Sequence, residues 1–170
     1  MSRYLFAQGA NGTVSDQRDG GGGDVLVDRE GTAAGLVPAS GGRTAHPNMP
    51  IPPPGVDVDA NIGITHIELS LSDWETAVSI WTYRVREGGL WDYTLLGLRY
   101  EDFGNFNYGA TGRVLVHGGT LERAAGAVQM LSGTSNPRWG TPLGIRPFGD
   151  QPIDNFWIRQ GIRYYESSLI

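Results

Sequence analysis

The distribution of aromatic residues most constrains how this 170-residue chain can fold. All five tryptophans follow Asp59, whereas the first 56 residues contain glycine and proline clusters at 20–23 and 50–54 and very few aromatic residues. A segment with so little apolar surface cannot offset the conformational entropy lost on ordering. The sequence therefore predicts a flexible leader or delivery linker over 1–56 and a single folded domain over 57–170.

Local patterns predict three amphipathic helices in that domain. The first covers 73–87, with a capping box that begins at Ser72 and apolar residues at helical spacing. The second starts at Thr120 as the cap and ends near Gly133. The third follows Asp150, which is interpreted as a helix cap rather than a catalyst because Pro152 falls in the first helical turn.

Two glycine-rich segments, 88–118 and 133–149, separate these helices and are expected to be irregular. The predicted fold class is therefore mainly α, a small module of amphipathic helices with glycine-rich loops. The run Val114–Val116 is too short to distinguish strand from helix. An α+β arrangement with one short hairpin remains the alternative.

Charge and motif content exclude several classes. The thirteen basic residues are all arginine and the eighteen acidic residues give a formal charge of −5, which disfavours a broad electrostatic contact with nucleic acid. The chain has no cysteine, no stretch resembling a Sec-type signal peptide and no run long enough to span a membrane. Dinucleotide, phosphate-loop, metalloprotease and serine-elbow motifs are also absent.

The segment Tyr100–Gly112 carries the densest chemistry, with two carboxylates, two amides and four aromatic rings between glycines. Glu101 and Asp102 are adjacent, so they point apart on any regular backbone, and one is expected to act while the other supports it. Desolvation by the surrounding rings would raise the pKa of whichever carboxyl group is buried, which suits a general acid. We expect Asn105 and Asn107 to orient substrate or stabilise charge, with Tyr108 also contacting substrate.

Other candidates lie nearby in the sequence. His117 is a less favoured proton-transfer residue; Arg113 is a candidate for holding a phosphate and Trp91 for stacking on a base or sugar. Asp57 and Asp59 would face one side of an extended segment, where they could hold a divalent cation. Solvated turn carboxylates are the favoured interpretation of that pair, so no cofactor is expected.

Several motifs together resemble the polymorphic toxin type 44 (bacterial toxin 44) family. They are Pro52–Ile62, Val85–Tyr93, Tyr100–Gly112, Arg123–Gly126, Phe148–Pro152 and Ile158–Ile162. The resemblance implies a C-terminal toxin domain on a bacterial delivery module, such as a contractile injection system, with ribonuclease activity. It also implies a cognate immunity protein, a carrier protein, and secretion or injection without a Sec-type signal. The sequence departs from the family pattern at 113–118 and at Gln151, where a second acid is usual.

Three functions remain open from the sequence. The first is the ribonuclease that the resemblance implies, which would act on RNA. The second is a peptidoglycan glycan hydrolase acting in the periplasm, favoured by the acidic balance and by the combination of aromatic, carboxylate and amide groups. The third is a non-enzymatic binding module of an injection apparatus. Both enzymatic readings make the domain a hydrolase.

Overall fold

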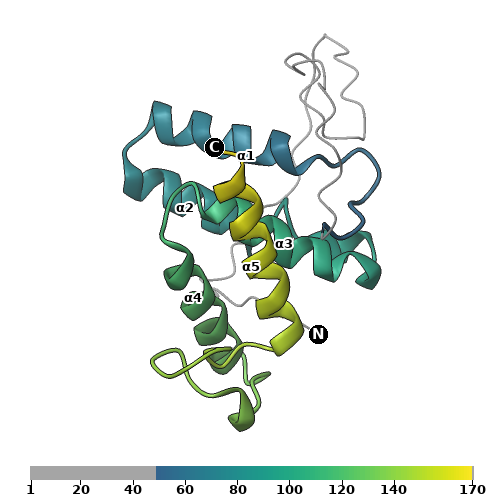
Figure 1. Cartoon of the computed structure of the whole chain (residues 1–170). Helices are drawn as coiled ribbons and strands as arrows, with labels where there is room; N and C mark the ends of the chain where they lie inside the picture. The colour runs from purple at the N-terminus through teal and green to yellow at the C-terminus, as the bar shows by residue number, and fades with distance from the viewer. Residues whose placement is uncertain (1–48, 170) are drawn as a thin grey trace, which may run out of the picture. The chain divides into compact units, whose positions relative to one another are not determined.

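A computed structural model describes residues 49–169 of the chain. That part contains five α-helices and three short 3-10 helices, and no strand (Figure 1). The prediction of a mainly α fold is confirmed, while the hairpin alternative is wrong for these residues. Pro53 is buried and Val56 packs against the core. Most of the predicted leader lies outside the described residues, so the division at 56 stays a prediction.

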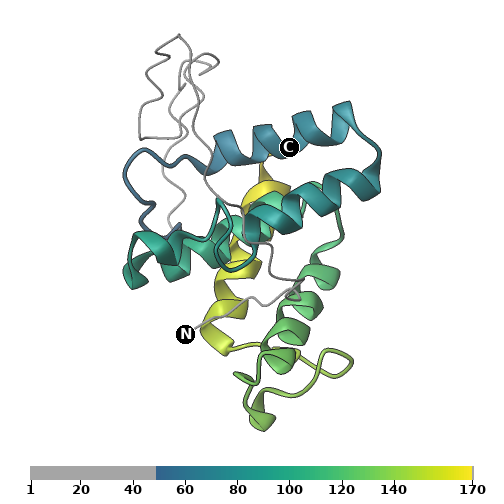
Figure 2. The same cartoon turned by 180° about the vertical axis from the view of Figure 1, so that it is seen from behind.

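The first two helices form an antiparallel pair, α1 (Val58–Leu71) and α2 (Trp74–Val85), which Figure 2 shows from behind. An ion pair between Glu68 and Arg84 links them. The helix predicted over 73–87 is confirmed as α2. Its cap is Asp73 rather than Ser72, because the Asp73 carboxylate accepts a hydrogen bond from the Thr76 N–H at 2.8 Å.

The extended segment predicted around Asp57 and Asp59 is wrong, because α1 begins there. Asp57 is the N-cap, and its carboxylate accepts a hydrogen bond from the Asp59 N–H at 2.8 Å. The Asp59 carboxylate in turn accepts from the Tyr164 hydroxyl at 2.9 Å. Both carboxylates therefore fix the start of α1, one locally and the other through the C-terminal helix.

The central helix is α3 (Glu101–Gly112), in a stretch that the glycine content predicted to be irregular. Helix α5 (Pro152–Ser167) crosses it at backbone contact. A Cβ atom on Gly109 would lie 2.0 Å from the Ile158 carbonyl oxygen, and one on Gly161 would lie 1.9 Å from the Phe106 carbonyl oxygen. Burial against α5 thus outweighs the low helix propensity of glycine.

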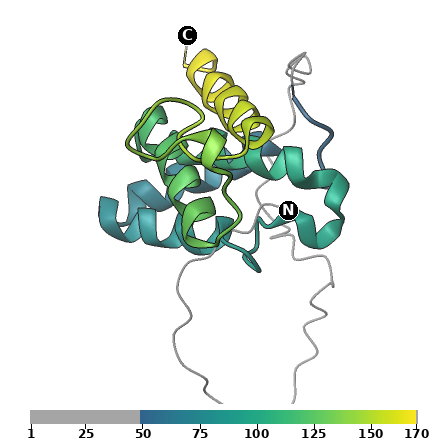
Figure 3. The ribbon, with the colours of Figure 1, turned by 90° about the horizontal axis from the view of Figure 1, so that it is seen from below.

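Helix α4 (Gly118–Leu131) lies against α5 and is followed by the irregular segment 132–151, seen beside it in Figure 3. The predicted cap Thr120 is wrong, since the His117 ring nitrogen Nδ1 accepts from the Gly119 N–H at 3.2 Å. Irregular structure over 133–149 is confirmed, apart from the 3-10 turn Pro137–Trp139. Gly126 lets the Phe148 carbonyl group approach α4, because a Cβ atom there would lie 2.0 Å from that oxygen.

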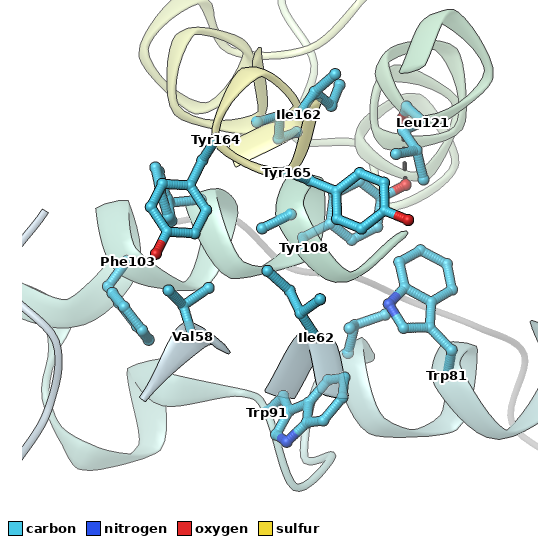
Figure 4. Packing of buried hydrophobic residues seen from close by; sticks show 14 of the residues in the cluster. Val58, Ile62, Trp81, Trp91, Phe103, Tyr108, Leu121, Ile162, Tyr164 and Tyr165 are labelled. Carbon is cyan, nitrogen blue, oxygen red and sulfur yellow. Dashed lines mark hydrogen bonds between the residues drawn. The ribbon is translucent and has the colours of Figure 1, made fainter. Parts of the chain in front are cut away.

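The core lies between α3 and the helices around it, and Figure 4 shows its aromatic residues. Phe103 and Phe106 of α3 and Ile158 of α5 are fully buried. The Trp81 indole N–H donates to the Thr111 hydroxyl at 2.9 Å, which fixes α2 against α3. Within the described range, no helix combines the length and apolar character needed to cross a membrane.

Candidate functional site

A shallow cleft runs between the N-terminal half of α3 and the loop that follows α2. Its lining includes three carboxylates and three aromatic rings and no basic side chain: Val85, Glu87, Trp91, Asp92, Tyr93, Thr94, Glu101, Gly104, Asn105 and Tyr108. The loop is held by its own backbone, since the Trp91 N–H donates to the Arg84 carbonyl group at 2.9 Å. The cleft is therefore an acidic, aromatic surface that spans two elements.

Asp92 shapes this loop through its carboxylate. One carboxylate oxygen accepts from the Gly88 N–H at 2.9 Å, and the other accepts from the Thr94 N–H at 3.2 Å as the cap of the 3-10 helix Tyr93–Leu96. The Asp92 oxygens are thus engaged by backbone groups. Glu87 is exposed, and Glu101 is half-buried in the first turn of α3. These two carboxylates are the better placed to meet a substrate.

The two adjacent acids of α3 have different surroundings. Glu101 lines the cleft, whereas Asp102 is not among its lining residues. Burial raises the pKa of Asp102, and the neighbouring Glu101 charge adds to the rise. Asp102, whose pKa is raised, therefore lies outside the cleft.

Of the two asparagines predicted to contact substrate, one lines the cleft and the other does not. Asn105 lines the cleft, and its amide N–H donates to the Asp154 carboxylate at 2.8 Å. Asn107 is fully buried on another face of α3, where its side-chain oxygen accepts from the Asn61 amide at 2.8 Å. The same Asn61 amide lies 2.7 Å from the Tyr93 hydroxyl. Asn105 thus belongs to the cleft, while Asn107 joins α1 to α3 in the interior.

The remaining sequence candidates do not all meet at the cleft. Tyr108 forms part of its floor, and its hydroxyl donates to the Leu121 carbonyl oxygen at 3.2 Å. Trp91 is 5 % exposed and packs in the core with only a small part facing the cleft, while the Arg84 guanidinium lies 5.0 Å from its ring centre. His117 caps α4, and Arg113 pairs with Glu166 at 2.8 Å; neither lines the cleft.

A group of buried polar residues behind the cleft was not identified from the sequence. Asp150 and Asp154 are fully buried, and Asp154 accepts from Gln129 at 3.0 Å as well as from Asn105. Burial, reinforced by the Asp154 charge, raises the pKa of Asp150 to about 8. The interpretation of Asp150 as a helix cap is wrong, since Gln151 is the N-cap residue of α5 and the Asp150 carboxylate accepts from the adjacent Gln151 N–H at 3.0 Å.

A sequence signal for this group existed on α4. Glu122 and Gln129 are seven residues apart, two helical turns, and are flanked by the apolar positions Leu121 and Val128. Glu122 is buried and forms a two-point ion pair with Arg146, at 2.5 and 2.8 Å. Polar residues placed regularly beside an apolar face indicate a buried polar partner.

The potential metal ligands in this part of the chain are dispersed. Within residues 49–169, no three or more histidine, cysteine, aspartate or glutamate side chains converge to form a metal site. The buried Asp154 carboxylate instead accepts hydrogen bonds from the side-chain amides of Asn105 and Gln129. The arrangement is suited to holding the Asn105 side chain in a fixed orientation at the back of the cleft.

Comparison with known proteins supports the family resemblance over part of the chain. Residues 93–167 match the family model described as bacterial toxin 44. The match covers α3, α4 and α5 and begins inside the loop that lines the cleft. It confirms the resemblance drawn from the sequence. No curated protein and no solved structure matches the chain significantly.

Proposed function

We propose that this protein is a toxin that acts as a hydrolase and that its cleft binds a glycan strand of the bacterial cell wall, in keeping with the match of residues 93–167 to the bacterial toxin 44 family. One observation carries the proposal: the cleft combines the carboxylates Glu87, Asp92 and Glu101 with aromatic rings and has no basic side chain. An RNA backbone would meet a negative surface there. A sugar chain has no backbone phosphates for this surface to repel.

Glu101 is the proton-transfer residue of this proposal. Glycoside hydrolysis requires one carboxylic acid to protonate the leaving oxygen and a second carboxylate on the other side of the scissile bond. Glu101 donates its proton to the leaving oxygen as the glycosidic bond breaks, and a water molecule attacks the anomeric carbon. Glu87 accepts the proton of that water, because the oxygens of Asp92 are held by backbone groups.

Asn105 and Asp154 support the site from behind. Asp154 accepts one Asn105 N–H at 2.8 Å and is itself fixed by Gln129 at 3.0 Å. A side chain fixed in this way presents its polar atoms to a substrate without further ordering. Asn105 therefore positions a sugar hydroxyl, while Asp154 is a positioning residue that acts through Asn105.

The alternative activity is the ribonuclease that the family resemblance implies. A cation near the cleft is Arg84, whose guanidinium group stacks on the lining residue Trp91. Arg84 is already paired with Glu68, however, and Arg113 lies away from the cleft. In either case the toxin would be delivered into a target cell by a carrier protein and neutralised in the producing cell by an immunity protein.

Expression in two compartments distinguishes the activities. We expect the chain to be toxic when exported to the periplasm and tolerated in the cytoplasm, because the wall is reached only from outside the inner membrane. The purified chain should release soluble glycan fragments from isolated cell walls and leave RNA intact. Toxicity confined to the cytoplasm, together with RNA cleavage, would establish the ribonuclease instead. Absence of toxicity in both compartments would favour the binding module.

Glu101→Gln tests the assigned residue. Removal of a positioned acid typically lowers the rate by about 10²–10⁴-fold, so wall digestion and killing should both be lost. Glu75→Gln is the matched control, since it makes the same chemical change on the exposed surface of α2. A fully toxic Glu101→Gln variant would show that the proton is transferred by another residue.

A further inference from the structure

A second cavity lies between α2 and α4 and shares the lining residue Tyr108 with the cleft. It has a volume of about 170 Å³ and an almost entirely apolar lining that includes Val78, Trp81, Val116, Leu121 and Val128. Figure 4 shows Trp81, Tyr108 and Leu121, which border it, on one side of the core. A dry apolar cavity of roughly 150 Å³ is large enough to bind a benzene ring. The space therefore suits one aromatic ring or a short alkyl chain.

Arg86 supplies a polar contact at this cavity. It is one of the lining residues, and its Nε atom is buried with no hydrogen-bond partner. Its guanidinium group lies 3.8 Å from the centre of the Tyr83 ring, which holds the side chain in place. A buried donor without a partner is costly, and a carboxylate is the acceptor that a guanidinium group binds most strongly. Thr82 and Thr120 also line the cavity and offer hydroxyl groups.

We propose that this cavity is a binding site for a small carboxylic acid with a single aromatic ring or a short alkyl chain. The apolar part lies among the side chains of α2 and α4, and the carboxylate accepts the Arg86 Nε–H. Val85 and Tyr108 line both this cavity and the cleft. A bound acid therefore packs against the wall of the candidate active site, although the site itself does not depend on the activity proposed above.

Binding is tested with phenylacetate as the probe and benzyl alcohol as its uncharged counterpart. Ligand-observed nuclear magnetic resonance and the melting temperature of the purified full chain are measured for each. We expect phenylacetate to bind one site per chain and raise the melting temperature with concentration, with an affinity about tenfold higher than that of benzyl alcohol. Failure of both phenylacetate and hexanoate to bind at millimolar concentration would overturn the proposal.

Two variants locate the site. Arg86→Met keeps the aliphatic stem but removes the guanidinium group, so the preference for phenylacetate over benzyl alcohol should disappear. Ala124→Leu adds volume inside the cavity and should abolish binding of both probes, whereas Ala127→Leu makes the same change on α4 outside the cavity lining. If Ala124→Leu does not fold, Val78→Phe fills the space from α2. Binding that survives the filling variants, or a preference that survives Arg86→Met, contradicts the assignment.

Discussion

Helices α3 and α5 each have a pair of acidic residues near their start, and the two pairs have opposite surroundings. Glu101 and Asp102 in the first turn of α3 are both partly exposed, and one of them lines the cleft. Asp150 and Asp154 at the start of α5 are fully buried. Acidic residues are favoured near helix N-termini, whether exposed or buried, because they complement the helix dipole. The difference shows that the same local signal can serve surface chemistry or interior structure, depending on what packs against it.

The largest expected effect tests the contact that buries the second group. Gly161→Ala would place a Cβ atom 1.9 Å from the Phe106 carbonyl oxygen, so α5 could not lie against α3. We expect the free energy of unfolding to fall by more than about 4 kcal/mol, measured by urea unfolding. Gly63→Ala on α1, where a Cβ atom meets nothing within 4 Å, should be neutral or stabilising by up to about 1 kcal/mol. Equal stability of the two variants would refute the backbone contact.

Removal of a buried acid should cost less than loss of the helix contact. Asp154→Ala leaves the amide donors of Asn105 and Gln129 without their acceptor. An unpartnered buried donor costs about 1–3 kcal/mol, so we expect a loss of about 2–4 kcal/mol in unfolding free energy. The corresponding change in the exposed group, Asp102→Ala, should cost less than about 1 kcal/mol. Similar losses of unfolding free energy in the two variants would mean that burial does not determine how much each acid contributes to stability.

The raised pKa of Asp150 predicts a pH dependence. Between about pH 4 and pH 8 only the folded state holds the Asp150 proton, because the pKa rises from 3.8 to about 8 on folding. The folded state then binds more protons, so stability falls as pH rises, by at most about 1.4 kcal/mol per pH unit. Below about pH 4 Asp150 is protonated in both the folded and the unfolded state, so its ionisation no longer lowers the stability.

Asp150→Asn removes this ionisation while keeping the shape of the neutral side chain. Urea unfolding at pH 5, 6, 7 and 8 should show the parent losing stability relative to the variant as pH rises. The neighbouring charges are Asp154 on α5 and Glu122 on α4, the latter paired with Arg146. Parallel stability curves for parent and variant would show that Asp150 is ionised throughout, despite its burial.

The smallest expected effect on stability belongs to the exposed group. Glu101→Gln should change the free energy of unfolding by less than about 0.5 kcal/mol, because a partly exposed carboxylate gains little from its surroundings. Glu75→Gln should behave alike in thermal melts, although only the first variant should lose activity. A large destabilisation by Glu101→Gln alone would place Glu101 with the structural acids.

The sequence predicted those helices whose apolar residues recur at helical spacing. Trp81 and Val85 at helical spacing located α2, and the apolar face containing Leu121 and Val128 located α4. The caps were less accurate, because Asp73 and His117, rather than the neighbouring Ser72 and Thr120, accept the hydrogen bonds that cap α2 and α4. Of the predicted site residues, Glu101 and Asn105 line the cleft, while Asn107 and His117 do not; their roles stay a prediction.

By itself, the sequence determined the mainly α fold and the resemblance to a toxin family whose model matches residues 93–167, because apolar periodicity and motif residues are local properties. Only the tertiary structure decided that Tyr100–Gly112 contains a helix, since its glycines disfavour one until α5 lies against Gly109. The fold also decided that Asp150 is a buried acid rather than a cap. Desolvation depends on what surrounds a carboxyl group in space. Only the folded chain brings Asp150 close to Asp154 of α5 and Glu122 of α4.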